Sequence, residues 1–160
     1  MKIQEDKFNY IYNKYSNNLY NIAYGYTRNY DDAIDIVQNV FLKLLNSKKE
    51  FKTYEDCFYF LIRVTINESI EFLRSNYKNK VIFDEELIIK TPSQNSNESL
   101  YDIEKAIESL PVKYKTIVIL YYYDLMPTKE IAKALNLSDA AVRKRLERAR
   151  LSMKEFLERN

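Results

Sequence analysis

The residues best suited to chemistry lie near the C-terminal end, in the segment NLSDAAVRKRLERAR (136–150). Apolar residues recur there at helical intervals, so one face of a helix would be buried and the opposite face would carry charge. The charged face consists of Arg143, Lys144, Glu147 and Arg148. Guanidinium groups presented in this way can bind guanine edges or phosphates in the DNA major groove. The alternative is a solvated face on which Glu147 pairs with Arg143 or Arg150 through helical spacing.

The residues before this segment supply the rest of a helix-turn-helix motif. The sequence PTKEIAKAL (127–135) has the periodicity of a helix, and Asn136 can adopt the left-handed conformation that a tight turn needs. Ser138 can then cap the N-terminus of the following helix. Two helices joined by such a short turn are typical of DNA-binding domains.

Other chemistry is restricted by what the chain lacks. Cys57 is its only cysteine and it has no histidine, which excludes disulfide frameworks, cysteine-histidine zinc sites and histidine-based acid-base mechanisms. The only dense group of carboxylates, Asp31, Asp32 and Asp35, is a weak candidate for a metal-dependent nuclease site. We therefore expect no catalytic residue, no cofactor and no metal site.

The composition predicts an all-α fold. The 160 residues include one glycine and three prolines, too few for a turn-rich β fold. The sequence contains neither a run of about 18 apolar residues nor a secretory signal, so we expect a cytoplasmic protein without membrane insertion. The net charge is only +2, but the basic excess falls within residues 100–160, where it would attract an anionic partner.

Two small helical domains, 1–77 and 100–160, are expected, joined by a flexible linker over 78–99. The linker ends in TPSQNSN, which favours turns and offers little to bury. Its apolar patch could equally make part of it a packed extension of the first domain. Apolar periodicity predicts a bundle of three helices in the first domain, the third beginning near Asp56. In the second domain, Pro111 is expected to start the central helix.

Two blocks of sequence resemble the small sigma factors of the extracytoplasmic-function (ECF) type, which bring bacterial RNA polymerase to promoters. The segments LYNIAYGYTRNYDDAIDIVQNVFLKLL and FYFLIRVTINESIEFLR are similar to region 2 of that family. The segment AIESLPVKYKTIVILYYYDLMPTKEIAKALNLSDAAVRKRLERARLSM is similar to region 4. The resemblance implies a non-enzymatic protein that directs promoter recognition and DNA melting. It also implies three partners: the RNA polymerase core, promoter DNA and an anti-sigma factor.

The resemblance further implies that the helix matching DDAIDIVQNVF binds the polymerase core. The residues concerned are Asp35, Gln38, Asn39 and Leu42. Family members commonly carry acids at the positions of Ile34 and Asn39, so this chain has lost two negative charges there. This departure puts the strength of core binding in doubt, and an ordinary solvated helix face is the alternative.

The loop FKTYEDCFY (51–59) stands where relatives capture an unstacked base of the minus-10 element. Aromatic faces can compensate an extruded base for the stacking it loses. The implied minus-10 contacts are Phe51, Lys52, Tyr54, Tyr59, Arg63, Asn67 and Arg74. Phe60 replaces a tryptophan that is frequent in the family, although core packing is an equal alternative for it. Surface pairing with Glu71 is the alternative for the two arginines.

Region 4, by resemblance, reads the minus-35 element. The implied contacts are Ala140, Arg143, Lys144, Glu147 and Arg148. Because Arg143 and Arg148 project about 140° apart around a helix, they cannot both reach the same base edge. We assign Arg143 to a base and Arg148 to the phosphate backbone, with the reverse assignment left open. Asp139 is expected to favour the helix N-terminus electrostatically.

A second hypothesis is a stand-alone dimeric helix-turn-helix repressor. Its N-terminal bundle would form the dimer, and it would need a palindromic operator and a symmetric interface. Co-purification with core polymerase, rather than self-association, would distinguish the sigma-factor hypothesis from this one.

Overall fold

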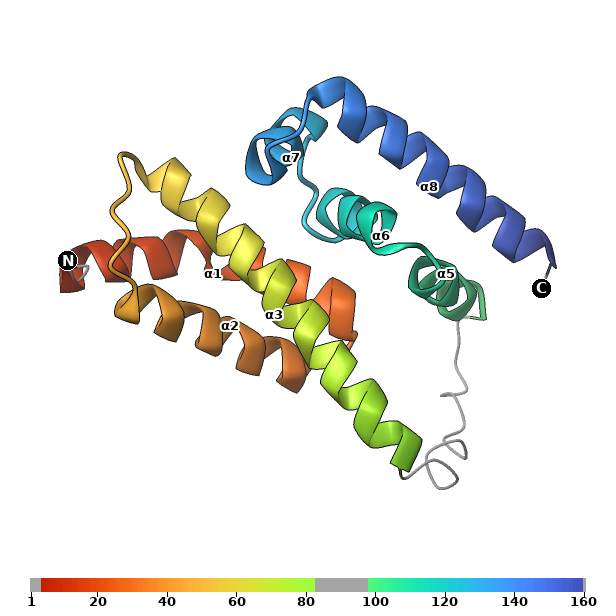
Figure 1. Ribbon diagram of the computed structural model, residues 1–160, viewed down its shortest axis with the longest axis horizontal. Coiled ribbons are helices and arrows are strands. Elements are labelled where there is room, and N and C mark those ends of the chain that lie inside the picture. The colour runs from red at the N-terminus through yellow and green to blue at the C-terminus, as the bar shows by residue number, and fades with distance from the viewer. Residues whose placement is uncertain (1–3, 83–97, 160) are drawn as a thin grey trace.

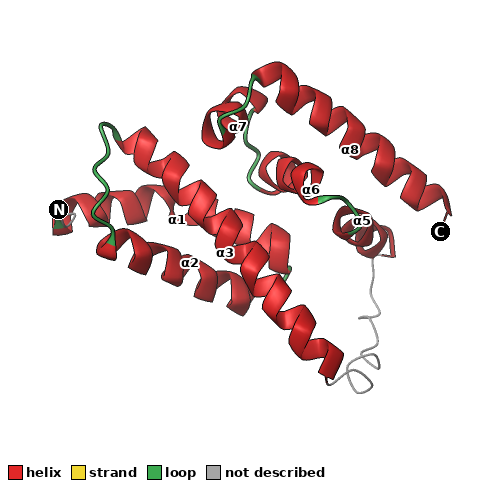
Figure 2. Ribbon diagram, viewed as in Figure 1, coloured by secondary structure: helices red, strands yellow, loops and turns green. Residues whose placement is uncertain are grey.

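The computed structural model describes residues 4–82 and 98–159. Over these residues the chain consists of helices and short connections, without a strand (Figures 1 and 2). The predicted all-α class is therefore confirmed. None of the helices in this part of the chain is long and apolar enough to cross a membrane.

The N-terminal part is a bundle of α1 (Glu5–Thr27), α2 (Tyr30–Asn46) and α3 (Tyr54–Ile82). The predicted apolar stripes form its core, with Ile11, Tyr15, Leu19, Ile22 and Tyr26 from α1, and Ala33, Val37, Val40, Phe41 and Leu44 from α2. Capping fixes where two of the helices begin. Asn29 accepts a hydrogen bond from the backbone N–H of Asp32 at 2.9 Å, and Thr53 accepts one from that of Asp56 at 3.0 Å. The cap at Thr53 explains why α3 begins slightly earlier than predicted.

The C-terminal part contains α5 (Glu98–Glu108), α6 (Val112–Val118), the π-helical segment η1 (Ile119–Tyr123), α7 (Thr128–Leu135) and α8 (Asp139–Arg159). The helix-turn-helix forms as predicted. Asn136 has a φ of 57° at the end of α7, and the Ser138 hydroxyl accepts a hydrogen bond from the backbone N–H of Ala141 at 3.0 Å. Pro111 precedes the central helix, which widens into a π-helical turn at η1 instead of continuing as an α-helix.

The two parts pack against each other. Helix α1 contacts η1 and α3 contacts α7, so that buried residues of both parts join in one hydrophobic core. Figure 1 shows α7 beside the N-terminal half of α3, with α8 on the far side of the C-terminal helices. Helix α3 also continues past residue 77 to Ile82. Helix α5 likewise begins at Glu98, within the last two residues of the predicted linker. Residues 83–97 lie outside the described residues, so the domain boundaries remain a prediction.

Candidate nucleic-acid interface

The residues predicted to contact the minus-35 element lie together on α8. Ala140, Arg143, Lys144, Glu147 and Arg148 are all exposed, and with Leu151 they line a shallow groove. The opposite side of α8 is buried through Val142, Leu146 and Ala149. Because apolar packing fixes this side of the helix against the domain, the basic side must face outward. The arrangement is a rigid helix that presents cations to a partner.

Two of these cations already have partners within the domain. The Arg143 guanidinium lies 3.2 Å from a carboxylate oxygen of Asp139, one turn earlier on α8. A hydrogen bond from Arg148 lowers the pKa of Tyr114. The Arg143 side chain is 66% exposed, so its ion pair is worth less than about 1 kcal/mol and can be exchanged for a phosphate or base at little cost. Asp139, and not Glu147, is therefore the residue that orients Arg143.

Arg150 does not belong to the exposed basic face. Its Nε donates a hydrogen bond to the Tyr122 hydroxyl at 2.8 Å, and its guanidinium lies over the rings of Tyr121 and Tyr122. These contacts hold α8 against η1. Periodicity predicts no such role for Tyr122, because its partner lies 28 positions further along the chain.

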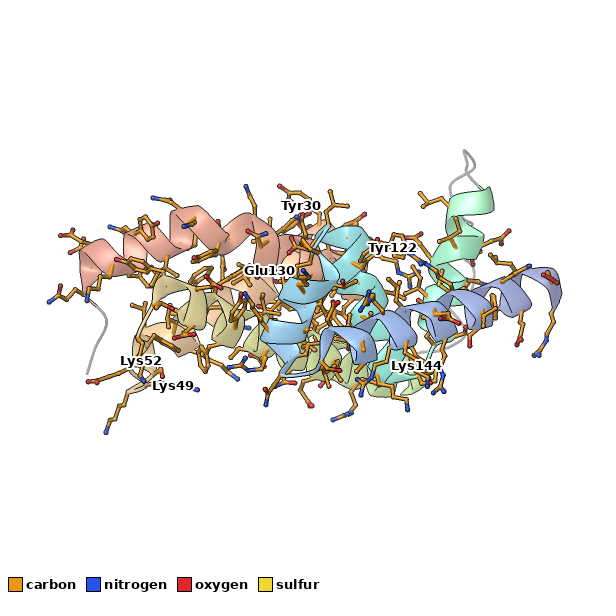
Figure 3. The ribbon with its side chains drawn as sticks, turned by 90° about the horizontal axis from the view of Figure 1, so that it is seen from above. Tyr30, Lys49, Lys52, Tyr122, Glu130 and Lys144 are labelled. Atoms are coloured by element: carbon orange, nitrogen blue, oxygen red, sulfur yellow. The ribbon has the colours of Figure 1, made fainter. Side chains whose placement is uncertain are left out.

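A second candidate site is a cavity of about 400 Å³ between the start of α1 and the loop before α3. Phe51, Lys52 and Tyr54, all predicted to bind the minus-10 element, line it together. The structure adds Lys7 and Lys49, which sequence reasoning missed because Lys7 is distant in the chain and neither lies in a motif. Three lysines and two aromatic rings around a cavity suit a base with its flanking phosphates. Figure 3 shows Lys49 and Lys52 near one end of the molecule, well separated from Lys144 of α8.

Neighbouring residues hold this cavity, named here the loop cavity, in place. The Tyr54 ring packs on the Tyr10 ring with centroids 4.5 Å apart. Phe60 is partly buried, with its ring against Phe51 and beneath the Lys49 ammonium. Burial raises the pKa of the Cys57 thiol to about 11, so this lining residue is neutral. The loop cavity is therefore lined by apolar side chains and by three lysines, with Glu50 as the one acid among its lining residues.

Tyr59 and Arg63 do not join the loop cavity. Tyr59 is only 8% exposed, and its hydroxyl lies 2.7 Å from a carboxylate oxygen of Glu55 and 2.6 Å from one of Glu130 on α7. Burial, followed by these hydrogen bonds, raises the tyrosine pKa. Arg63 donates a hydrogen bond to the Ala134 carbonyl oxygen, also on α7, at 2.9 Å. The Tyr59 hydroxyl and one N–H group of Arg63 are thus bonded to the C-terminal part of the same chain, while the Arg63 side chain stays exposed.

The other two predicted minus-10 residues of α3, Asn67 and Arg74, are accessible. Asn67 is exposed. Arg74 pairs with Glu71 at 3.2 Å, and both side chains are more than half exposed, so the surface pairing considered for Arg74 is present. An exposed pair of this kind contributes little stability and leaves the arginine available to a phosphate.

The predicted polymerase-binding residues share one exposed face of α2. Asp35, Gln38, Asn39 and Leu42 point away from the bundle core, and Leu42 is 54% exposed. Ile34, one of the two departures from the family pattern, is partly buried. A mixed polar and apolar face of this kind suits packing against a partner helix.

Comparisons with known proteins agree with both parts of the chain. Residues 11–79 match the family model of Sigma-70 region 2, and residues 100–153 match that of Sigma-70, region 4. The RNA polymerase sigma factor SigV of Bacillus subtilis is 32% identical over 81% of this chain and 78% of its own length. The ECF RNA polymerase sigma factor SigW of Bacillus subtilis is 25% identical over 98% of this chain and 91% of its own length. Nothing in these matches supports the repressor hypothesis.

Some relatives are longer than this chain. The ECF RNA polymerase sigma factor SigE of Mycolicibacterium smegmatis is 25% identical over 90% of this chain, but the match spans only 59% of SigE. Among solved structures, the sigma factor RpoE in complex with the anti-sigma factor NepR from Bartonella quintana aligns with a TM-score of 0.65 and 20% identity, covering 95% of this chain and 97% of RpoE. CnrH in complex with the cytosolic domain of CnrY aligns with a TM-score of 0.63 and 19% identity, covering 98% of this chain and 91% of CnrH. These two structures establish a shared fold.

Proposed function

Since this chain belongs to the RNA polymerase sigma factors of the ECF type, we propose that it directs the polymerase core to promoters and assists their melting. The exposed basic face of α8 in a helix-turn-helix supports this proposal most directly. No cluster of three or more metal-binding side chains occurs in the described ranges. The protein supplies DNA contacts to a polymerase that carries out the chemistry.

The α8 face is proposed to bind the minus-35 element. Arg143 is held by Asp139 near the start of α8, whereas Arg148 lies further along, near Tyr114. The N-terminal residues of a recognition helix commonly reach base edges, and flanking cations contact phosphates. This placement supports Arg143 as the base contact and Arg148 as the backbone contact, with Lys144 and Glu147 between them.

The loop cavity is proposed to hold an unpaired base of the minus-10 element. Its rings offer stacking surfaces, and its lysines can neutralise the flanking phosphates. Melting a duplex without ATP requires such compensation, because each extruded base loses its stacking and pairing. The accessible Asn67 and Arg74 of α3 would extend the same contact along the strand.

The exposed face of α2 is proposed to bind the polymerase core, which would place the protein in the cytoplasm. An anti-sigma factor is the further proposed partner. RpoE and CnrH share this fold and were solved in complex with NepR and with the cytosolic domain of CnrY. Such a partner could control access to the same surfaces.

Transcription by purified bacterial core polymerase, with and without this protein, tests the proposal. Genomic DNA fragments serve as templates, and the transcript start sites are sequenced. We expect new start sites that depend on the protein and share minus-10 and minus-35 sequences. Arg143→Ala should reduce their use, and core alone is the control. If the protein neither binds core nor changes the start sites, the proposed function is wrong.

A further inference from the structure

The C-terminal part of the chain contacts two residues that the N-terminal part would use on DNA. The hydroxyl of Tyr59 contacts Glu130, and Arg63 donates to the Ala134 carbonyl oxygen. Both partners lie on α7, and Figure 3 places Glu130 at the middle of the molecule. While α7 holds these groups, a base cannot reach the buried Tyr59 hydroxyl, and the exposed Arg63 offers a phosphate only the N–H groups that do not bond to Ala134. The exposed basic face of α8, in contrast, stays open in the same arrangement.

The contact between the two parts is close and specific. Gly25 of α1, the only glycine in the chain, is buried at this contact. A Cβ atom there would lie 2.6 Å from Cγ2 of Ile119 and 3.0 Å from Cγ of Tyr123, both on η1. Close approach of α1 to η1 therefore requires a residue without a side chain at position 25. The hydroxyls of Tyr26 and Thr116 also share a buried hydrogen bond of 2.7 Å across the contact.

Several polar features of the contact oppose its formation. Tyr59 has one hydroxyl hydrogen, so it can satisfy only one of Glu55 and Glu130 at a time. Asp124 is 8% exposed, and its carboxylate receives hydrogen bonds only from the neutral amides of Asn18 and Asn21 among the described residues. Desolvated carboxylates without a cation are costly. A contact that carries such costs is suited to opening, as interfaces between domains commonly are.

We propose that this contact is autoinhibitory: docking of η1 and α7 on α1 and α3 competes with single-stranded DNA for Tyr59 and Arg63. The docked chain can present α8 to a duplex but cannot use the Tyr59 hydroxyl or the Arg63 N–H group that bonds to Ala134. Opening the contact, on polymerase or DNA, releases both residues. This inference rests on the proposed function, because it assigns a regulation to the proposed minus-10 surface.

Gly25→Gln tests the proposal from the N-terminal side. The added side chain collides with η1, yet glutamine raises the helix propensity of α1, so the bundle itself should stay folded. Gly25→Ala should give an intermediate effect. Asn9→Gln is the matched control, because Asn9 is exposed and lies about 160° around α1 from Gly25. Circular dichroism checks that each variant retains its helices.

Glu130→Gln tests the proposal from the C-terminal side, and its expected effect on docking is the opposite one. Its amide removes one of the two carboxylates around Tyr59 and can still accept the tyrosine hydrogen. The variant should therefore dock more tightly than the wild type. It also makes the chain more positive, so a purely electrostatic effect on DNA binding would go the other way.

Two measurements on the full chain decide the matter. Small-angle scattering should give a radius of gyration of about 15 Å for the docked wild type and a larger value for Gly25→Gln. Fluorescence anisotropy with a labelled single-stranded DNA pool of random sequence measures binding. If nine in ten molecules are docked, Gly25→Gln should bind about tenfold tighter, and Glu130→Gln more weakly. Adding Arg63→Ala to Gly25→Gln should remove part of the gain, because Tyr59 stays released.

The proposal is overturned if the wild type is already extended, or if Gly25→Gln expands without binding DNA more tightly. Equal gains in Asn9→Gln would also overturn it. The transcription assay with core polymerase tests the proposed function separately, because the random pool needs no promoter. If the opened chain binds single-stranded DNA more tightly but never redirects the polymerase, the proposed competition stands and the proposed sigma-factor function is wrong.

Discussion

Acidification should strengthen docking of the two parts through Asp124. Burial raises the pKa of this carboxyl from 3.8 to about 6, against an opposing effect of its hydrogen bonds from Asn21 and Asn18. Because these amides place α1 over the Asp124 carboxyl, opening the contact should expose the group to water and return its pKa towards the ordinary value. The docked state then binds more protons than the open state between these two values. The cost of burying the charge is fully present above pH 6 and disappears as the pH falls.

The size of the effect follows from the same shift. A difference of one bound proton between the docked and open states changes the free energy of docking by about 1.4 kcal/mol per pH unit. Between pH 7 and pH 5 the docked carboxyl takes up most of a proton, whereas the open carboxyl stays ionised. Docking should therefore strengthen by about 1.3 kcal/mol, or nearly tenfold. Asp124→Asn is neutral at every pH, so it should dock more tightly at pH 7 and lose most of this dependence.

Carbon-13 NMR of the Asp124 carboxyl measures the pKa directly. We expect a value near 6 in the wild type and a much lower one in Gly25→Gln, where the contact is open. Scattering at pH 7 and pH 5 should show the compact fraction rising on acidification in the wild type only. An unchanged pKa in Gly25→Gln would show that the burial is internal to the C-terminal part, and the argument would fail.

Three further predictions concern the DNA-binding surfaces. Arg143→Ala should cost roughly 1–3 kcal/mol and relax preference at one minus-35 position, whereas Arg148→Ala should weaken all sequences alike and lower the salt slope by about one; binding to single-base variants at several salt concentrations checks this. Tyr54→Ala should impair open-complex formation, followed by permanganate reactivity, while duplex minus-35 binding stays nearly unchanged. Ser138→Ala removes the cap of α8 and should lower the free energy of unfolding by about 1 kcal/mol in thermal denaturation.

Sequence reasoning predicted the local features of the site. Helical periodicity separated the buried Val142 and Leu146 from the exposed Arg143 and Lys144, because side chains three and four positions apart share a face wherever the helix packs. The left-handed Asn136 and the cap at Ser138 follow from short-range chemistry in the same way. The family resemblance, carried by contiguous motifs, was also visible in the sequence.

Only the tertiary structure decided how the two parts meet. Nothing within α1 explains a glycine at position 25, and nothing in its own segment marks Asp124 as a buried acid. Both are explained by the packing of η1 against α1. At the same contact, Tyr59 and Arg63 bond to α7 and do not line the loop cavity. These pairs are separated by about 70 to 100 positions, and periodicity reports which face of a helix is buried but not which distant helix covers it. The sequence alone therefore determined the helices and their exposed chemistry, while long-range packing determined which of those residues are free to bind DNA.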